Sequence, residues 1–329
     1  MSNLLFPVLS ILADGKFHSG EEMAKHLNVS RVSIWHTLSD TKKLGVEVFS
    51  VKGKGYRLSQ PLILIEEDKV KRAIGEMANL FNIKVLEVVD STNDYLKKEV
   101  TNGYPHASCV VTNFQTNGKG RRGRQWQSAL GENLIFSFLW RFTKGASALS
   151  GLSLAVGVAL IRSLKKINIH KALLKWPNDI LILEDGIYKK LAGVLIELQG
   201  DMDGQSAAII GIGINLNLSK KQNAKIDQPA TSLFHWLDEE VNPNDFLAVI
   251  IKDLAEVLAA FEEDGFGKLK EEWLSYDAFH DQVVNISSGD RNIIQGRSRG
   301  VNDVGSLEVV TLDGVKTFAS GEITLRRSE

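Results

Sequence analysis

The sequence predicts a multidomain α+β fold made of three units. Residues 1–62 follow the order of three helices and a β-hairpin, which is that of a winged helix-turn-helix domain. Residues 66–272 combine apolar strands with amphipathic helical patterns. Residues 273–329 contain only short strands with turn signals between them. A length of 329 residues is sufficient for more than one hydrophobic core.

The composition is that of an ordinary globular protein. Apolar residues make up 43% and charged residues 24%, which excludes collagen, long disorder and a disulfide scaffold. The net charge is −1, so any nucleic-acid contact needs a local basic patch. Cys109 is the only cysteine, which excludes a zinc site of the CxxC type and fits a reduced, cytoplasmic setting. We read no signal peptide, and the apolar stretch Gly151–Ile161 is too short to span a membrane.

Helix signals justify the first unit. Apolar residues at helical spacing predict a helix within Leu4–Leu12. Ser19 and Ser30 are residue types that cap helix N-termini, so they predict the starts of two more helices. The strands Val46–Val51 and Tyr56–Leu58 then flank a turn rich in glycine and lysine. This hairpin would be the wing.

Basic residues concentrate in the second half of this unit. Six of them lie from Arg31 to Arg57, against two acids. The third helix would enter the major groove of DNA, and the wing lysines would reach phosphates. The alternative is a small helical interaction domain with a solvated basic face, and Trp35 is equally consistent with packing. The candidate DNA-binding residues are Ser30, Arg31, Trp35, His36, Thr37, Lys42, Lys52 and Lys54.

The second unit opens after the linker Ser59-Gln60-Pro61. The acids Glu66, Glu67 and Asp68 lie in the first turn of the next predicted helix, where they oppose its dipole. An apolar strand over residues 85–89 leads into Asp90-Ser91-Thr92-Asn93-Asp94, which precedes another helix. These hydroxyl and amide groups either cap that helix or bind a small polar head group at its N-terminus.

The loop Gly118–Arg124 is the most informative segment. It holds three glycines and four cations, and no acid occurs from Val100 to Gly131. Backbone amides and side-chain charge could together wrap a polyanion. The glycines also satisfy G-x-G-x-x-G, but a strand follows them in place of a helix, which disfavours a dinucleotide site. A P-loop motif is absent, and a solvated basic loop is the remaining alternative.

Three further polar segments interrupt strands. Lys175-Trp176-Pro177-Asn178-Asp179 separates a short strand from a longer one. Lys190 opens the predicted strand Lys190–Glu197, either as a strand-edge charge or as a functional group. Gly211 and Gly213 share one face of a strand, so a group could approach that face closely. No cluster has metal-ligand spacing, so we predict no metal site on the protein.

Short strands justify the third unit. They are predicted at Val283–Ile286, Ile293–Arg299, Ser306–Thr311 and Val315–Phe318. The turn signals Ser288-Gly289-Asp290 and Asp313-Gly314 separate them.

Five motifs, in this order along the chain, resemble those of biotin–protein ligases. They are Ser91-Thr92-Asn93, Gln115 with Gly118–Gly123, Lys175–Asp179, Lys190–Gly193 and Gly213-Ile214-Asn215. With the N-terminal unit, the chain resembles the bifunctional bacterial members that also repress the biotin operon. The resemblance implies a mixed β-sheet with flanking helices, like that of class II aminoacyl-tRNA synthetases and biotin ligases, over residues 66–272. It implies an SH3-like β-barrel over residues 273–329.

The resemblance also implies a reaction and its partners. Biotin and ATP, with Mg²⁺, would give biotinoyl-5′-AMP and pyrophosphate. The biotinoyl group would then pass to a lysine of the biotin carboxyl carrier protein of acetyl-CoA carboxylase. A homodimer loaded with biotinoyl-AMP would bind operator DNA of the biotin operon.

Site residues are carried over from the family motifs. Lys190 and Arg121 would be catalytic. The residues implied for biotin are Ser91, Thr92, Asn93, Gln115, Lys119, Gly120, Arg121, Lys190 and Gly193. Those implied for ATP or the adenylate are Arg121, Arg124, Trp126, Lys175, Asn178, Asp179, Asn215 and Arg326. Lys119 departs from the family, which usually has arginine there, and lysine lacks the planar fork.

In this interpretation Lys190, Arg121 and Lys119, with Mg²⁺, would neutralise the repulsion between a carboxylate and the α-phosphate. The sequence indicates no general base for the transfer step. Three alternatives stay open. They are a ligand-sensing transcriptional regulator whose biotin-binding domain is not catalytic, an enzyme like the lipoate or octanoyl ligases, and a nucleotide-binding oxidoreductase.

Overall fold

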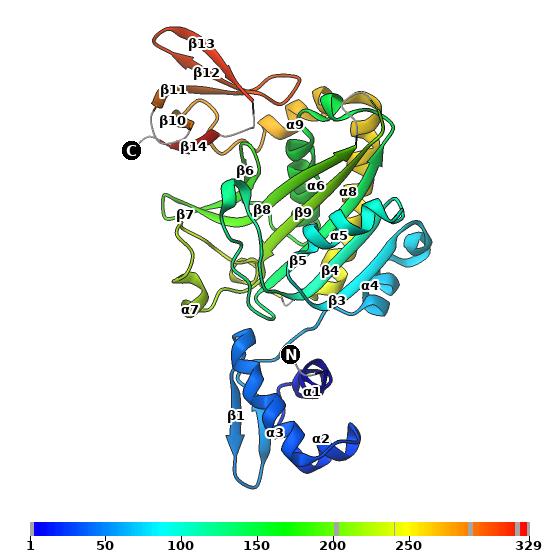
Figure 1. The fold of residues 1–329 in the computed structure, drawn as a ribbon. Helices are drawn as coiled ribbons and strands as arrows, with labels where there is room; N and C mark the ends of the chain where they lie inside the picture. Colours follow the sequence, from blue (N-terminus) through cyan, green and yellow to red (C-terminus); the bar gives the residue numbers. More distant parts are fainter. Residues whose placement is uncertain (1–2, 201–203, 240, 289–291, 320–322, 328–329) are drawn as a thin grey trace.

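The computed structural model describes residues 3–200, 204–239, 241–288, 292–319 and 323–327. Three units follow one another along the molecule, with the N-terminal helices at one end and the last strands at the other (Figure 1). Each unit contains one β-sheet, of two, seven and five strands in chain order. Within the described ranges, no helix combines the length and apolar character needed to cross a bilayer.

The N-terminal unit has the predicted winged helix-turn-helix order. Ser19 accepts a hydrogen bond from Glu21 N at 3.2 Å, and Ser30 accepts one from Ser33 N at 3.1 Å, so both predicted caps are confirmed. Apolar faces of the three helices meet in one buried core. The elements are α1 (Leu5–Leu12), α2 (Gly20–His26), α3 (Arg31–Asp40), η1 (Thr41–Leu44), β1 (Val48–Val51) and β2 (Gly55–Leu58).

The central unit is built on a mixed sheet in the order β3-β4-β5-β9-β8-β7-β6. The pair β3 and β4 is parallel, and the other neighbours are antiparallel. The strands are β3 (Asn82–Val89), β4 (Ser108–Gln115), β5 (Asn133–Phe142), β6 (Ala172–Lys175), β7 (Asp179–Glu184), β8 (Ile187–Gly200) and β9 (Ser206–Asn215).

Helices cover both faces of this sheet. The helices α6 (Leu152–Lys166) and α8 (Pro243–Asp264) lie behind it in Figure 1, and α5 (Thr92–Thr101) lies in front. Side chains of β5 and β9 therefore alternate between two buried layers, as a sheet covered on both faces requires. The smaller helical elements are α4 (Glu67–Ile74), η2 (Gly75–Leu80), η3 (Arg121–Gly123), η4 (Ala146–Leu149), α7 (Lys220–Asn223), η5 (Leu233–His235), η6 (Phe266–Leu269) and α9 (Lys270–Leu274).

The prediction that Lys190 opens a strand is wrong. The strand begins at Ile187, and Lys190 is its fourth residue. The cause is a tight hairpin at Asp185-Gly186, where both residues have positive φ and Ile187 pairs with Glu184. An Asp-Gly pair is typical of such two-residue turns.

The C-terminal unit is an antiparallel sheet in the order β13-β12-β11-β10-β14. This arrangement is consistent with the SH3-like domain that the resemblance implies. A fifth strand, β14, was not predicted, and it closes one edge against β10. The turn expected at Gly289-Asp290 lies outside the described residues. The strands are β10 (Val283–Ser288), β11 (Asn292–Val301), β12 (Leu307–Thr311), β13 (Gly314–Phe318) and β14 (Ile323–Arg327).

Specific contacts join the units. Leu130, from the central unit, is buried in the N-terminal core, and its N–H donates to Leu44 O at 3.3 Å. At the other end, Leu174 N donates to Tyr276 O at 2.7 Å, and the Trp176 indole donates to Gly305 O at 3.1 Å.

Asp277 lies at the second of these junctions. Its Oδ1 accepts a hydrogen bond from Phe279 N at 3.0 Å. Its Oδ2 is buried without a hydrogen-bond partner among the described residues. Burial disfavours the charged form and raises the pKa of this carboxyl to about 6.

We expect Asp277→Asn to stabilise the fold in a pH-dependent manner. The folded-state pKa lies above the ordinary value of 3.8. Below pH 4 the carboxyl is neutral in the folded protein, so no charge is buried. As pH rises from about 4 to about 6 the unfolded state loses its proton more readily, and the folded state loses stability. The variant should gain up to about 3 kcal/mol in unfolding free energy at pH 8 and almost nothing at pH 4. Urea unfolding at both pH values measures this. Asp303→Asn, at an exposed acid, is the control, and an equal gain there would contradict the explanation.

Candidate functional site

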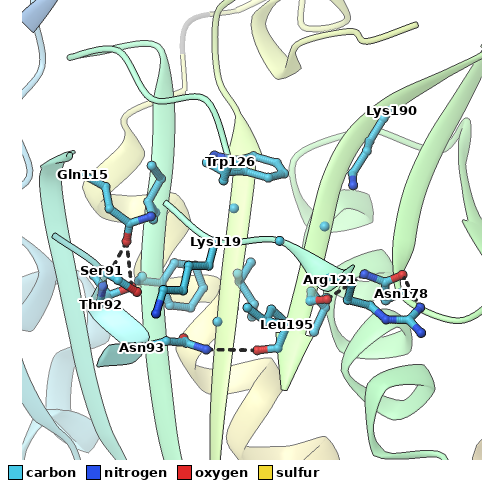
Figure 2. Close-up of a pocket in the computed structure, with 18 residues that line it drawn as sticks. Ser91, Thr92, Asn93, Gln115, Lys119, Arg121, Trp126, Asn178, Lys190 and Leu195 are labelled. Atoms are coloured by element: carbon cyan, nitrogen blue, oxygen red, sulfur yellow. Dashed lines mark hydrogen bonds between the residues drawn. The ribbon is translucent and has the colours of Figure 1, made fainter. Parts of the chain in front are cut away.

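A pocket opens on the face of the central sheet that α5 covers. It lies at the N-terminus of α5, over β4, β5, β9 and β8, beneath the segment 118–126 (Figure 2). Its volume is about 490 Å³, including its open mouth. The lining residues are Ser91, Thr92, Asn93, Gln115, Lys119, Gly120, Arg121, Trp126, Ile135, Phe136, Asn178, Lys190, Gly193, Val194, Leu195, Gly211, Ile212 and Gly213.

One side of the pocket carries hydroxyl and amide groups. Ser91 caps α5, accepting a hydrogen bond from Asp94 N at 3.3 Å. Gln115, at the end of β4, accepts the Thr92 N–H at 2.9 Å, which ties the strand to the first turn of the helix. Thr92 and Gln115 are buried. The helix N-terminus and these side chains therefore present a fixed set of neutral donors and acceptors.

The glycine- and arginine-rich loop folds back on itself above the sheet. Gly120 N donates to Arg124 O at 2.8 Å, and Trp126 N donates to Gly118 O at 3.0 Å. A side chain at position 118 would clash with Trp126 O and the Gln115 amide, which requires glycine there. The close turn places Trp126 against the sheet between Gln115 and Lys190 (Figure 2).

Side chains from other segments pack directly against the two glycines of β9. A Cβ at Gly213 would lie 2.5 Å from Cε2 of Trp126, and one at Gly211 would overlap Oδ1 of Asn93. The predicted close approach to this face is therefore confirmed, with Trp126 and Asn93 as the approaching groups. The Trp126 Nε1 donor is buried and has no acceptor among the described residues.

The other side of the pocket carries cations. Arg121 Nη1 donates to Asn178 Oδ1 at 3.1 Å, and burial lowers the pKa of the guanidinium. Lys119 Nζ lies 2.6 Å from Asp94 Oδ2. This contact holds Lys119 on the same side as Ser91, Thr92 and Asn93, so the neutral groups lie across the pocket from Arg121 and Lys190 (Figure 2).

Lys190 lies on the same side of the pocket as Arg121 and has a buried partner. Its Nζ lies 2.7 Å from Asp179 Oδ1, and both side chains are mostly buried. The Asp179 oxygen makes no well-aligned hydrogen bond, so the contact is a charge pair. The ammonium group also lies 5.6 Å from the centre of the Trp126 ring.

Five residues predicted for the nucleotide lie outside the pocket lining. Arg124 is exposed, and Asp179 is the partner of Lys190. The Lys175 ammonium lies 5.8 Å from the centre of the Phe279 ring. Asn215 is 4% exposed, and its amide donates to Thr231 O at 3.1 Å. Arg326 lies in β14, where its backbone pairs with Asn285 of β10, and its side chain is outside the described part of the structure.

Several lining residues were not predicted. They are the apolar residues Ile135, Phe136, Val194, Leu195 and Ile212. Alternation along β5 could have indicated Ile135, which lies two positions from Ser137 on the α5 face, whereas Phe136, Val194 and Ile212 belong to the core layer on the opposite face. Strand pairing, which the sequence does not print, decides which of these faces meet at the pocket.

A second candidate surface lies on α3 and the wing. Trp35 is 56% exposed, and Ser30, Arg31, His36, Lys42, Lys52 and Lys54 are also exposed. The prediction that Thr37 faces DNA is wrong, since Thr37 is 2% exposed. It lies one helical turn from Ile34 and from Thr41, on the inner face of the helix.

No group of three or more histidine, cysteine, aspartate or glutamate residues within the described ranges could hold a metal ion.

Comparison with known proteins identifies the family. The profile of the Biotin/lipoate A/B protein ligase family matches residues 85–215. Profiles of an HTH domain and of the biotin protein ligase C terminal domain match residues 5–57 and 279–326. The bifunctional ligase/repressor BirA of Salmonella typhimurium is 36% identical over 98% of this chain and 97% of its own length. This chain belongs to the biotin–protein ligase family.

Other members of the biotin–protein ligase family agree. BirA of Escherichia coli is 35% identical over the same shares of the two chains. The biotin protein ligase from Aquifex aeolicus in complex with biotin and ATP has a TM-score of 0.63 at 30% identity, covering 75% of this chain and 99% of that one. The resemblance based on five motifs is confirmed, and so is the fold class.

We expect Gly213→Ala to displace Trp126 in this ligase-family pocket while the fold is retained. The added methyl group would overlap the indole, and alanine fits an extended strand. The contribution of Trp126 to the fluorescence is the difference between spectra recorded with and without Trp126→Phe. This difference spectrum should change when Gly213→Ala is introduced. Gly120→Ala is the control, because its Cβ would meet nothing closer than 3.5 Å. An unchanged difference spectrum for Gly213→Ala would contradict the packing described.

Proposed function

We propose that the chain activates biotin with ATP, giving biotinoyl-5′-AMP and pyrophosphate, and then transfers the biotinoyl group to the amine of a carrier-protein lysine, with release of AMP. One observation carries the proposal. A single pocket sets buried hydroxyl and amide groups opposite Arg121 and Lys190. Biotin has a neutral cyclic urea at one end and a carboxylate at the other, which match these two sides.

The orientation of biotin follows from this division. The urea would lie by Ser91, Thr92 and Gln115, where neutral donors and acceptors are held in place. The carboxylate would lie toward Lys190 and Arg121. Gly193 leaves room beside the Lys190 side chain, since a Cβ there would lie 3.0 Å from its Nζ.

The first step requires two anions to meet, namely the biotin carboxylate and the α-phosphate of ATP. The carboxylate oxygen attacks the α-phosphorus, and the bond to the pyrophosphate oxygen breaks. Lys190, Arg121 and Lys119 would balance the negative charge around this phosphate. Positioning and electrostatics would supply most of the rate, because little proton transfer is needed.

The charge pair of Lys190 with Asp179 supports a role in which a ligand carboxylate takes the place of Asp179 beside the lysine. Asp179 supplies a counter-charge to Lys190 where the lysine side chain is only 17% exposed. An arriving carboxylate would share or replace Asp179 as the counter-charge, so the lysine need not be stripped of water at that moment. Asn178 would hold Arg121 in the same way until phosphate arrives.

We propose that Mg²⁺ accompanies ATP. Magnesium is often held through substrate phosphates with one or two carboxylates, which fits a pocket without a ligand cluster among its described residues. Bound there, it would neutralise phosphate charge.

The partners complete the proposal. The acceptor would be the biotin carboxyl carrier protein of acetyl-CoA carboxylase, and a cytoplasmic homodimer loaded with biotinoyl-AMP would bind operator DNA through α3 and the wing. The 35–36% identity to bifunctional ligase/repressors over 98% of the chain supports both roles. Lipoate is the second candidate acid, because the matching family profile covers biotin and lipoate ligases together.

We expect Lys190→Ala to abolish most biotin-dependent ATP–pyrophosphate exchange. Losing one preorganised cation at developing charge typically costs about 10²–10³ in rate. Exchange should appear in the wild-type chain with biotin and not with lipoate. Lys189→Ala is the matched control, since Lys189 pairs with Glu184 outside the pocket lining. Near-normal exchange in Lys190→Ala would remove Lys190 from the mechanism, and exchange with lipoate alone would favour the second acid.

We expect the double variant Lys52→Ala/Lys54→Ala to weaken DNA binding without changing sequence preference. Each lost phosphate contact should reduce the slope of log K against log salt by about 0.9. Fluorescence anisotropy with a duplex, over a range of salt concentrations, measures this slope. Lys268→Ala, at an exposed lysine of the central unit, should leave the slope unchanged. An unaltered slope in the double variant would argue against the wing as a DNA contact.

A further inference from the structure

A row of hydrogen-bonded side chains runs beneath the pocket floor. Asn93 Nδ2 lies 2.8 Å from Glu197 Oε2, and Asn93 Oδ1 lies 2.6 Å from Ser137 Oγ. Ser137 Oγ lies 2.7 Å from Thr92 Oγ1. Ser137 is fully buried, and Asn93 and Thr92 nearly so. Thr92 and Asn93 line the pocket, whereas Glu197 is not among the lining residues.

The carboxylate at one end fixes the direction of every bond in this row. An ionised carboxylate only accepts, so the Asn93 amide must turn its nitrogen toward Glu197 and its oxygen toward Ser137. The Leu195 carbonyl, 3.4 Å from Asn93 Nδ2, favours the same orientation (Figure 2).

The amide orientation then decides where the hydroxyl protons lie. Asn93 Oδ1 cannot donate, so the single Ser137 proton lies between Ser137 and Asn93. The short contact from Ser137 to Thr92 must then hold the Thr92 proton. Gln115 Oε1 is a weaker competitor for that proton, at 3.3 Å, and it already accepts the Thr92 N–H.

We propose that Glu197 is a positioning residue that makes the Thr92 hydroxyl an acceptor toward the pocket. With its proton committed to Ser137, Thr92 offers lone pairs to a ligand N–H, which the cyclic urea of biotin supplies. The assignment rests on the proposed function for the identity of that ligand. It extends the site by a residue outside the pocket lining, 104 positions from Asn93 in sequence.

Lys97 makes the proposal testable. Its Nζ lies 2.7 Å from the other Glu197 oxygen, Oε1. Glutamine at position 197 has one oxygen for two donors, and the charged Lys97 would take it. The glutamine NH₂ would then face the Asn93 NH₂, so that the row loses its fixed direction. Removing Lys97 as well would return the single oxygen to Asn93.

We expect Glu197→Gln to raise the Kd for biotin about three- to tenfold, the usual range for one neutral hydrogen bond. Lys97→Met alone should stay within about twofold of wild type, and Lys97→Met/Glu197→Gln should recover to a similar value. Isothermal titration with biotin measures Kd in the full-length chain. Parallel exchange assays should show unchanged kcat and unchanged KM for ATP, which separates positioning from general damage.

Glu184→Gln is the matched control. Glu184 is buried to a similar degree and also pairs with a lysine, but it lies outside the pocket lining, so its variant should bind biotin normally. Normal binding by Glu197→Gln, equal weakening in the control, or failure of the double variant to recover would each overturn the role of Glu197. Absence of biotin binding by the wild-type chain would instead overturn the proposed function itself.

Discussion

Burial of the central sheet on both faces is the constraint on which the other features depend. Even-numbered residues of β5, such as Phe136 and Phe138, pack into the layer beneath α6 and α8. Odd-numbered residues face α5 and pass from apolar Leu139 to polar Ser137 and then to the pocket at Ile135. A one-residue shift in register would exchange these two layers. The packing that stabilises the fold therefore also places the polar floor of the site.

The charges of the pocket are arranged in pairs before any ligand arrives. Lys119 faces Asp94, and Lys190 faces Asp179. An unpaired cation at the buried position of Lys190 would be costly, whereas a paired one can be held ready. The same pairing reduces the net attraction for a single anion. Selectivity would then come from ligands that satisfy the neutral side and the charged side at once.

Two kinds of feature could be predicted from the sequence, namely local helix caps and motifs that follow one another in a fixed order along the chain. Ser19, Ser30 and Ser91 cap the helices that their residue types indicated. Eleven residues predicted for the site meet in one pocket because the motifs lie on neighbouring strands, at the N-terminus of α5 and in the loop above them. They are Ser91, Thr92, Asn93, Gln115, Lys119, Gly120, Arg121, Trp126, Asn178, Lys190 and Gly193. What the sequence could not provide is pairing across strands. The contact of Asn93 with Glu197 depends on such pairing, and so does the buried position of Asn215. Thr37 is different, since its spacing from Ile34 already indicated the inner face of α3.

The two glycines of β9 have a consequence for how this site can evolve. Gly211 and Gly213 make room for Asn93 and Trp126, and both of those side chains line the pocket. Any larger residue at either glycine displaces the side chain packed against it. Single substitutions at these two positions therefore disturb two lining side chains of the pocket, whereas Lys119 is 43% exposed and lies outside the packed strand face. We would expect lineages of this pocket to explore new specificities through the loop long before they alter the strand.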